Sequence, residues 1–170
     1  VSTKTTQSLY LKKNTATFMY LPTIILRHKK ENLKKCSLRG LETREDMLFY
    51  TYPRDTLPSL EKYILLSLEG PALSKEDKDF GLFLIDGTWK HATTMFSQLQ
   101  KPHVFTVRSL PGSWQTAYPR RQEDCIDPTR GLASIEALYV AYHILGRDTS
   151  HIFDFYHWKN LFLEKNHTLL

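Results

Sequence analysis

Short apolar runs, separated by polar and turn-forming stretches, mark the predicted strands of this chain. Runs rich in β-branched and aromatic residues are typical of strands, and uninterrupted apolar runs indicate burial on both faces of a sheet. Proline and glycine interrupt such runs because they weaken regular strand pairing. The pattern predicts strands over residues 23–27, 47–52, 62–68, 82–85 and 104–108, with breaks at Pro53 and at Glu69-Gly70-Pro71.

Apolar positions spaced three and four residues apart predict helices between and after these strands. The clearest helix covers residues 131–146 and is expected to end at Gly146 as its C-cap. Further helices are predicted over residues 30–42, from Trp89 onward and over residues 153–165, with a brief helical turn at 74–79. Because strands and helices broadly alternate, the predicted class is a single α/β domain with a mainly parallel sheet flanked by helices.

Two stretches fall outside this alternation. Residues 1–20 are rich in Thr, Ser and Lys, which predicts a loose arm ahead of a domain at residues 21–170. Residues 110–130 contain three prolines and no clear periodicity. Irregular segments of that length are usually functional loops, so a binding loop is expected here.

Composition narrows the class of protein. With 41% hydrophobic and 12% aromatic residues, the chain can bury a core, and no apolar run reaches the roughly 20 residues of a membrane span. Two cysteines, Cys36 and Cys125, indicate a reducing, cytoplasmic setting, and without a Cys-x-x-Cys pair no metal site is expected. The net charge of +5 permits an RNA partner without requiring one.

The segment with the most chemical content is Asp86-Gly87-Thr88-Trp89, which joins a predicted strand to a predicted helix. A carboxylate at the carboxyl end of a strand, beside a helix N-terminus, lies where open α/β sheets bind ligands. Asp86 is therefore a candidate acid–base group, and equally a candidate capping group for backbone N–H groups beyond Gly87. Thr88 is the candidate N-cap, and Trp89 fits either a ligand contact or a core position.

Three segments in order carry a family resemblance: His28-x-x-Glu31 with Arg39 behind it, Asp86-Gly87-Thr88-Trp89, and Tyr118-Pro119-Arg120-Arg121 followed by Leu132-Ala133-Ser134-Ile135-Glu136-Ala137. Together they resemble the DTW-domain family of tRNA-uridine aminocarboxypropyltransferases, which has relatives that modify rRNA. The resemblance runs from about Leu21 to Leu145. It departs from the family pattern at Ala133-Ser134, where Ser-Thr is usual, and in the length of the stretch from Gln122 to Leu132.

The resemblance implies a SPOUT-like fold with a C-terminal trefoil knot and transfer of the 3-amino-3-carboxypropyl group of S-adenosylmethionine to N3 of a uridine in tRNA. Methylthioadenosine would be released, and Asp86 would act as the base. The cofactor-binding residues it implies are Leu66, Ser67, Leu68, Asp86, Gly87, Thr88, Trp89, Ser134 and Glu136. The RNA-binding residues it implies are His28, Lys34, Lys35, Arg39, Tyr118, Arg120 and Arg121.

Plainer interpretations remain open for several of these residues. The basic side chains predict either phosphate contacts or a solvated face, and His28 either contacts RNA or caps its strand. Ser134 and Glu136 either face a cofactor or satisfy backbone donors at a helix N-terminus. The alternative functions are the same transfer on rRNA, methyl transfer to RNA by a SPOUT-like enzyme, and a non-catalytic RNA-binding module.

Overall fold

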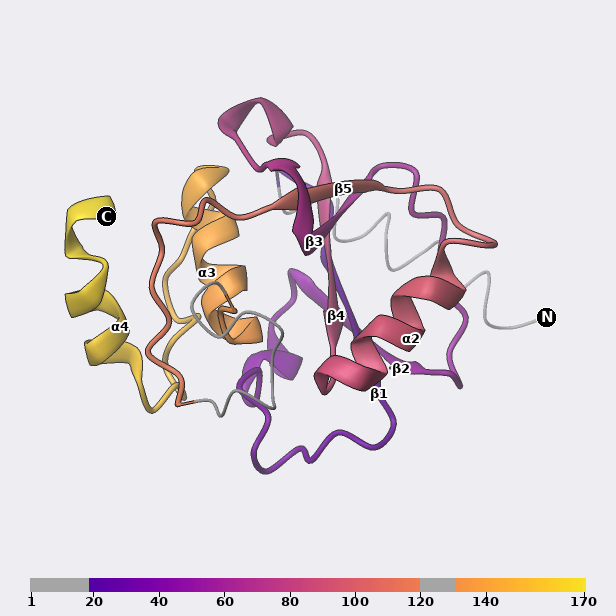
Figure 1. Ribbon diagram of the computed structural model, residues 1–170, viewed down its shortest axis with the longest axis horizontal. Helices are drawn as coiled ribbons and strands as arrows, with labels where there is room; N and C mark the ends of the chain where they lie inside the picture. Colours follow the sequence, from indigo (N-terminus) through magenta and orange to yellow (C-terminus); the bar gives the residue numbers. More distant parts are fainter. Residues whose placement is uncertain (1–18, 120–130) are drawn as a thin grey trace.

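Parallel strands form the centre of the molecule. The computed structural model describes residues 19–119 and 131–170, and within them the sheet has five strands in the order β2-β1-β4-β3-β5 (Figure 1). The strands are β1 (Thr23–His28), β2 (Met47–Tyr52), β3 (Tyr63–Ala72), β4 (Gly81–Asp86) and β5 (Thr106–Ser109). All of their pairings are parallel, which confirms the predicted single α/β domain and parallel sheet.

Successive side chains of the central strands enter two separate cores, because neighbouring residues of a strand point to opposite faces. On β1, Ile24 and Leu26 pack with Phe83 and Met95 on one face, whereas Ile25 belongs to the core on the other face. Figure 1 shows helix α2 (Trp89–Leu99) on one side of the sheet and α3 (Ser134–Ile144) on the other. The apolar strands are thus buried on both sides.

The C-terminal helix α4 (Lys159–Lys165) lies outside α3 (Figure 1) and contributes Phe162 to the larger core. The predicted helix over residues 153–165 is therefore too long, because residues 151–155 form turns and Phe155 remains 65% exposed. The helix predicted over residues 131–146 begins three residues later than expected, at Ser134. Gly146 does lie just beyond its end, with a positive φ of 69°.

The helix predicted over residues 30–42 is wrong. Residues 29–40 form a chain of turns, followed by the short 3-10 helix η1 (Leu41–Thr43). The buried side chains here are Cys36 and Leu38 in the loop and Leu41 at the start of η1, a spacing that fits isolated anchors better than a helix stripe. Gly40 adopts a φ of 95°, which interrupts a right-handed helix directly.

The end of β3 is less regular than a simple strand break. β3 reaches Ala72, beyond the strand break predicted at residues 69–71. However, Ser67 and Ala72 both pair with Ser109 of β5, so the register shifts between them and residues 68–71 form a bulge. The short 3-10 helix η2 (Lys75–Asp77) follows, capped by Ser74 as the sequence predicts.

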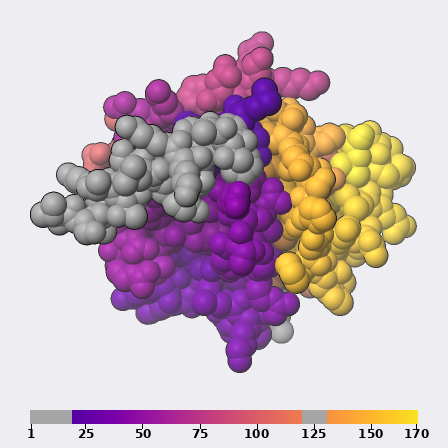
Figure 2. Space-filling view, turned by 180° about the vertical axis from the view of Figure 1, so that it is seen from behind, coloured from indigo at the N-terminus to yellow at the C-terminus, as the bar shows by residue number. Residues whose placement is uncertain are grey.

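Figure 2 shows the molecule from behind, with α3 and the C-terminal segment side by side along one flank. Another short 3-10 helix, η4 (His167–Leu169), ends this segment. None of the helices in the described part of the chain has both the length and the apolar character needed to cross a membrane. The predicted arm at residues 1–20 lies almost wholly outside the described residues, and so do residues 120–130 of the predicted binding loop.

Candidate functional site at the carboxyl edge of the sheet

The candidate site forms where β1 and β4 end side by side. Arg27 and Asp86 are register partners on these two parallel strands, so both side chains reach the carboxyl edge of the sheet. The turn Gly87-Thr88 then leads directly into α2. Thr88 occupies the N-cap position, but its side chain makes no capping hydrogen bond. This edge is where open parallel sheets bind ligands.

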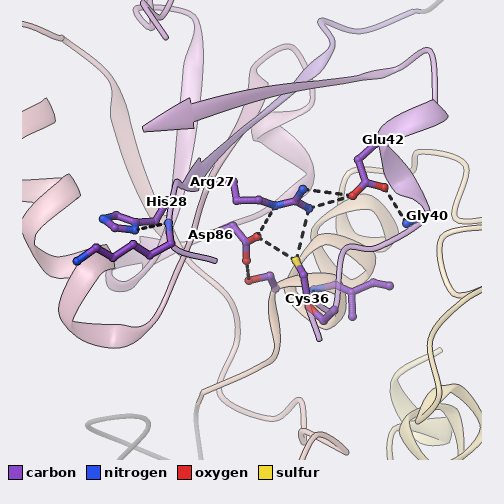
Figure 3. Close-up of polar contacts among 10 residues, drawn as sticks. Arg27, His28, Cys36, Gly40, Glu42 and Asp86 are labelled. Atoms are coloured by element: carbon purple, nitrogen blue, oxygen red, sulfur yellow. Dashed lines mark hydrogen bonds and ion pairs between the residues drawn. The ribbon is translucent and has the colours of Figure 1, made fainter. Parts of the chain in front are cut away.

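Asp86 is buried and accepts hydrogen bonds from three other parts of the chain. Its Oδ2 accepts from Arg27 Nε and from Cys36 Sγ, each at 3.2 Å, as Figure 3 shows. Its Oδ1 accepts from Ser134 Oγ at 3.1 Å, at the first residue of α3. Asp86 therefore links β1, the loop 29–40 and α3, and both of its carboxylate oxygens accept hydrogen bonds from the protein.

Arg27 is the cation at the centre of this cluster (Figure 3). Besides Asp86, its guanidinium contacts Glu42 Oε1 through Nη1 at 3.2 Å, and its Cζ lies 4.8 Å from the ring centroid of Phe49. Nη2 also donates to Cys36 Sγ at 3.4 Å. Breaking a buried ion pair by removing one partner leaves an uncompensated charge, so these residues depend on one another.

Glu31, Cys36 and Asp86 have potential ligand atoms within 4.8 Å of one another, a spacing that resembles a metal site. One observation argues against that interpretation, because Arg27 already supplies a cation to both Asp86 and Cys36. Burial raises the pKa of the Cys36 thiol to about 12, and the negative charge of Asp86 adds to the rise, so without a metal ion the sulfur is a protonated donor.

A cavity of about 790 Å³ opens in front of this cluster. Its volume falls within the range of about 300–1,000 Å³ that is usual for small-molecule sites. Three separate parts of the chain supply most of its walls: the end of β3, the turn into α2 with the first turns of that helix, and the segments before and at the start of α3. Apolar walls and few polar groups give it the character of a ligand site.

The structure brings most of the predicted cofactor residues together around this cavity. Those that line it are Leu66, Ser67, Leu68, Gly87, Thr88, Trp89 and Ser134. The Trp89 side chain is 41% exposed, so it is not the core tryptophan that the sequence left open. Asp86 lies behind Ser134 and reaches the cavity through that hydroxyl group.

Glu136 is placed differently from the other predicted cofactor residues. It is fully buried and accepts hydrogen bonds from Thr116 Oγ1 at 2.6 Å and from the backbone N–H groups of Ala117 and Ala133 at 2.8 Å. The last bond is the glutamate half of a capping box; alanine has no side-chain acceptor to supply the other half. Glu136 thus fastens the segment before α3 to the helix N-terminus.

The predicted RNA-binding residues are dispersed around the same edge. His28 is buried at the end of β1, where its Nδ1 accepts from Lys30 N–H and its ring stacks on His91 at 3.7 Å between centroids. Tyr118 lines the cavity. Lys34, Lys35 and Arg39 are exposed on the loop 29–40, so they do not share one face of a helix as the sequence predicted. Arg120 and Arg121 lie outside the described residues.

One residue with functional character was missed from the sequence-based site, namely Glu31. It lines the cavity, close to Asp86 and Cys36. Burial raises the pKa of its carboxyl group, the charge of Asp86 adds to this rise, and Arg27 opposes it. Its position in the His28-x-x-Glu31 segment was the signal that could have identified it.

Fold and site define a class, that of α/β proteins with a ligand cavity at the carboxyl edge of a parallel sheet. Among solved structures, the chain is similar to the SAM-dependent rRNA:acp-transferase Tsr3 from Vulcanisaeta distributa, with a TM-score of 0.67 and 22% identity. The similarity covers 88% of this chain and 80% of that chain, and at this identity it shows a shared fold. No protein-family profile and no curated protein matches the sequence.

Proposed function

We propose that this protein transfers the 3-amino-3-carboxypropyl group of S-adenosylmethionine to a uridine in RNA, as a member of the DTW-domain family. One observation carries the proposal. Gly87, Thr88 and Trp89, which follow Asp86 in the turn, border a cavity of about 790 Å³ in a fold shared with a SAM-dependent rRNA:acp-transferase. The turn carries the family resemblance. The fold is independently similar to that of an enzyme named for aminocarboxypropyl transfer.

The residues around the cavity fit this cofactor. Leu65, Leu66, Leu84 and Ile85 supply apolar surface of the kind that an adenine ring packs against. The exposed ring of Trp89 offers a face to a cationic sulfonium group, since aromatic faces attract cations within about 6 Å. S-adenosylmethionine would supply an activated carbon bonded to sulfur, and the protein would hold that carbon in line with the substrate.

The start of α2 is suited to the carboxylate of the methionyl group. Thr88, Trp89 and Lys90 all line the cavity at the N-terminus of this helix, where backbone N–H groups lack partners within the helix. The helix dipole and these donors favour an anion. Lys90 adds a positive charge at the same rim. A zwitterionic ligand would thus meet matching groups at this end.

The proposal includes a SPOUT-like arrangement with a C-terminal trefoil knot. Its support is the meeting of three distant segments around one cavity: residues 66–69, residues 84–90 and the segments on either side of residues 120–130. Loops at these positions are the ones that the resemblance implies around the adenosine. Glu136 would hold the last of them against α3 through Thr116 and Ala117.

Two RNA substrates compete within this proposal. The Gly87-Thr88 pair in the signature favours tRNA, because the family branch that modifies rRNA tends to carry Cys-Ser there. The structural neighbour acts on rRNA, which favours the ribosomal substrate. In either case Tyr118 and exposed Lys90 at the cavity suit an unstacked base and its phosphate. Exposed Lys29 and Lys30 directly precede Glu31 in the chain and suit further phosphates.

The test uses two preparations of S-adenosylmethionine, one labelled at the methyl carbon and one at the carboxyl carbon, with purified tRNA and rRNA from cells lacking the gene. Aminocarboxypropyl transfer moves only the carboxyl label into RNA and leaves the methyl label in methylthioadenosine. The RNA fraction that becomes labelled identifies the substrate.

The other functions give different results in the same assay. A methyltransferase moves only the methyl label into RNA. A non-catalytic RNA-binding module moves neither label and gives no heat above background when S-adenosylmethionine is titrated by calorimetry. Either result would refute the proposed transfer.

A further inference from the structure

Resting on the proposed function, we propose that Glu31, rather than Asp86, is the general base that takes the proton from the uridine and that Asp86 is a positioning residue. Glu31 lines the cavity, whereas Asp86 does not. Both carboxylates belong to the same cluster at the ends of β1 and β4, with potential ligand atoms within 4.8 Å of one another.

Asp86 is poorly placed to accept a proton from a substrate. Its Oδ2 is occupied by Arg27 and Cys36, and its Oδ1 by Ser134. Its charge is also balanced by the guanidinium of Arg27 at 3.2 Å. Both carboxylate oxygens of Asp86 are therefore held by donors of the protein, and Asp86 is not among the residues that line the cavity.

Glu31 differs on each of these points. In residues 19–119 and 131–170, no group donates a hydrogen bond to its carboxylate, and its backbone N–H bonds to His28 O. Arg27 is directed instead toward Asp86, Glu42 and Cys36. A half-buried carboxylate at a cavity wall, with its lone pairs available, meets the geometric requirement for a general base.

The groups around Glu31 also make it a stronger base than an ordinary glutamate. Burial raises the pKa of Glu31, and the negative charge of Asp86 on β4 raises it further, whereas Arg27 on β1 lowers it. Cys36 from the loop 29–40 remains a neutral thiol. A raised pKa increases proton affinity and moves the group toward the pH at which the enzyme works.

The proposed reaction is a displacement at the γ-carbon of the methionyl chain. The N3–H proton of the uridine passes to the Glu31 carboxylate as N3 forms a bond to the γ-carbon of the methionyl chain. The bond from that carbon to sulfur breaks, and its electron pair stays on sulfur, which turns the cationic sulfonium into neutral methylthioadenosine. Glu31 then releases the proton to solvent, so no oxidant, reductant or metal is required.

The first measurement is the single-turnover rate of carboxyl-label transfer between pH 5 and 9, with saturating cofactor and RNA. For the wild type, the rate is expected to rise with pH and level off above the pKa of Glu31. For Glu31→Gln, it should fall about 100-fold or more, because general bases contribute that much, and the pH dependence should be lost. The exposed Glu61→Gln is the matched control and should behave as wild type.

The second measurement is independent of activity. A carboxyl group with a raised pKa stabilises the fold at low pH, and this contribution is lost as pH rises through its folded-state pKa. Glu31→Gln should therefore melt at a higher temperature than wild type at pH 8 and at the same temperature at pH 4. Calorimetry with S-adenosylmethionine should give a dissociation constant within a few-fold of the wild-type value.

The outcomes separate this inference from the function on which it rests. A wild-type protein that transfers no carboxyl label refutes both. A Glu31→Gln variant that keeps wild-type turnover refutes the base assignment alone, and so does one that loses cofactor affinity while keeping its single-turnover rate. In that last case Glu31 would only attract the sulfonium.

Discussion

Asp86 couples the turn between β4 and α2 to three other parts of the chain. Arg27, Cys36 and Ser134 all donate to it, so one carboxylate fixes the relative positions of β1, the loop 29–40 and α3. Such a residue contributes to stability and to the shape of the site at once. Its substitution is expected to affect both, which the sequence-based view of a simple catalytic base does not anticipate.

Asp86→Ala should lower the free energy of unfolding by about 3–5 kcal/mol, because it leaves buried Arg27 without one of its two carboxylate partners. Asp86→Asn should cost less, since its amide oxygen still accepts a hydrogen bond. Asp86→Ala should also lose turnover, because Ser134 is no longer held in place. Urea unfolding followed by circular dichroism measures the first effect, and exposed Asp79→Ala is the control. An Asp86→Ala protein as stable as the wild type would contradict the structural role.

Glu42→Gln should show the opposite pH dependence to Glu31→Gln. Burial alone would raise the pKa of Glu42, but the N–H groups of Glu42 and Gly40 and the charge of Arg27 outweigh it and lower the pKa. A depressed pKa contributes stability above the unfolded value, and this is lost as the pH falls. At pH 7 the free energy of unfolding of Glu42→Gln should thus be below that of the wild type, by less than about 1 kcal/mol at this exposed site. Its melting temperature should be slightly lower at pH 7 and equal to that of the wild type at pH 3. Equal melting at pH 7 would exclude the contribution.

At the scale of elements, the loop 29–40 shapes the site although it has no regular structure. It is held by short-range turns, by buried Cys36 and Leu38, and by Gly40 in a left-handed conformation. It places Glu31 at the cavity and Cys36 against Asp86. The precision of the site therefore depends on these anchors rather than on a helix.

Gly40→Ala should test this dependence. Gly40 has a φ of 95°, and a Cβ added there would overlap the ring of Phe155. The expected loss is about 2 kcal/mol in the free energy of unfolding, compared with about 1 kcal/mol for Gly146→Ala, which has a positive φ but no neighbour in the way. Gly112→Ala, with neither constraint, should leave stability unchanged. Thermal melting curves measure all three, and equal values for Gly40→Ala and Gly112→Ala would contradict the prediction.

These elements also show what the sequence could reveal. The central strands β1 and β4 are predictable because their signal is local: a short run of apolar residues buried on both faces. The last strand is predicted from its alternation instead, and β5 is only partly buried. The helix at residues 30–42 was predicted from the spacing of Leu33, Leu38 and Leu41, but Leu33 is 56% exposed. The conformation of this loop depends on contacts with residues distant in sequence, such as Phe155 beside Gly40. A local sequence pattern does not contain these contacts.

The site was predictable to a similar degree. The turn from Gly87 to Trp89 was recognised because its residues are contiguous, and the structure places it at the cavity. Arg27 and Asp86 are 59 residues apart and meet only because of the strand register. The sequence alone therefore does not show that the Asp86 carboxylate is hydrogen-bonded to Arg27. The separation of Glu31 from Asp86 in sequence concealed the second carboxylate for the same reason.

At the scale of the whole molecule, the excess positive charge of +5 should make RNA binding sensitive to salt. Replacing exposed Lys29 and Lys30 by Ala should weaken RNA binding and reduce the slope of log affinity against log salt by about 1–2. Lys62 and Lys78, exposed near the opposite edge of the sheet, form the matched control pair. Filter binding between about 50 and 300 mM salt measures these slopes. Equal slopes for the two pairs of variants would contradict RNA contact at Lys29 and Lys30.

The buried thiol of Cys36 has a practical consequence. Because it is protonated, enclosed and hydrogen-bonded to Asp86, it can be alkylated only when the loop 29–40 moves away from the sheet. Its rate of modification in a Cys125→Ser background would therefore time the opening of that loop in the native protein. A ligand that fills the neighbouring cavity and holds the loop closed would lower the rate of Cys36 alkylation. That rate would therefore measure ligand occupancy of the cavity without an added probe.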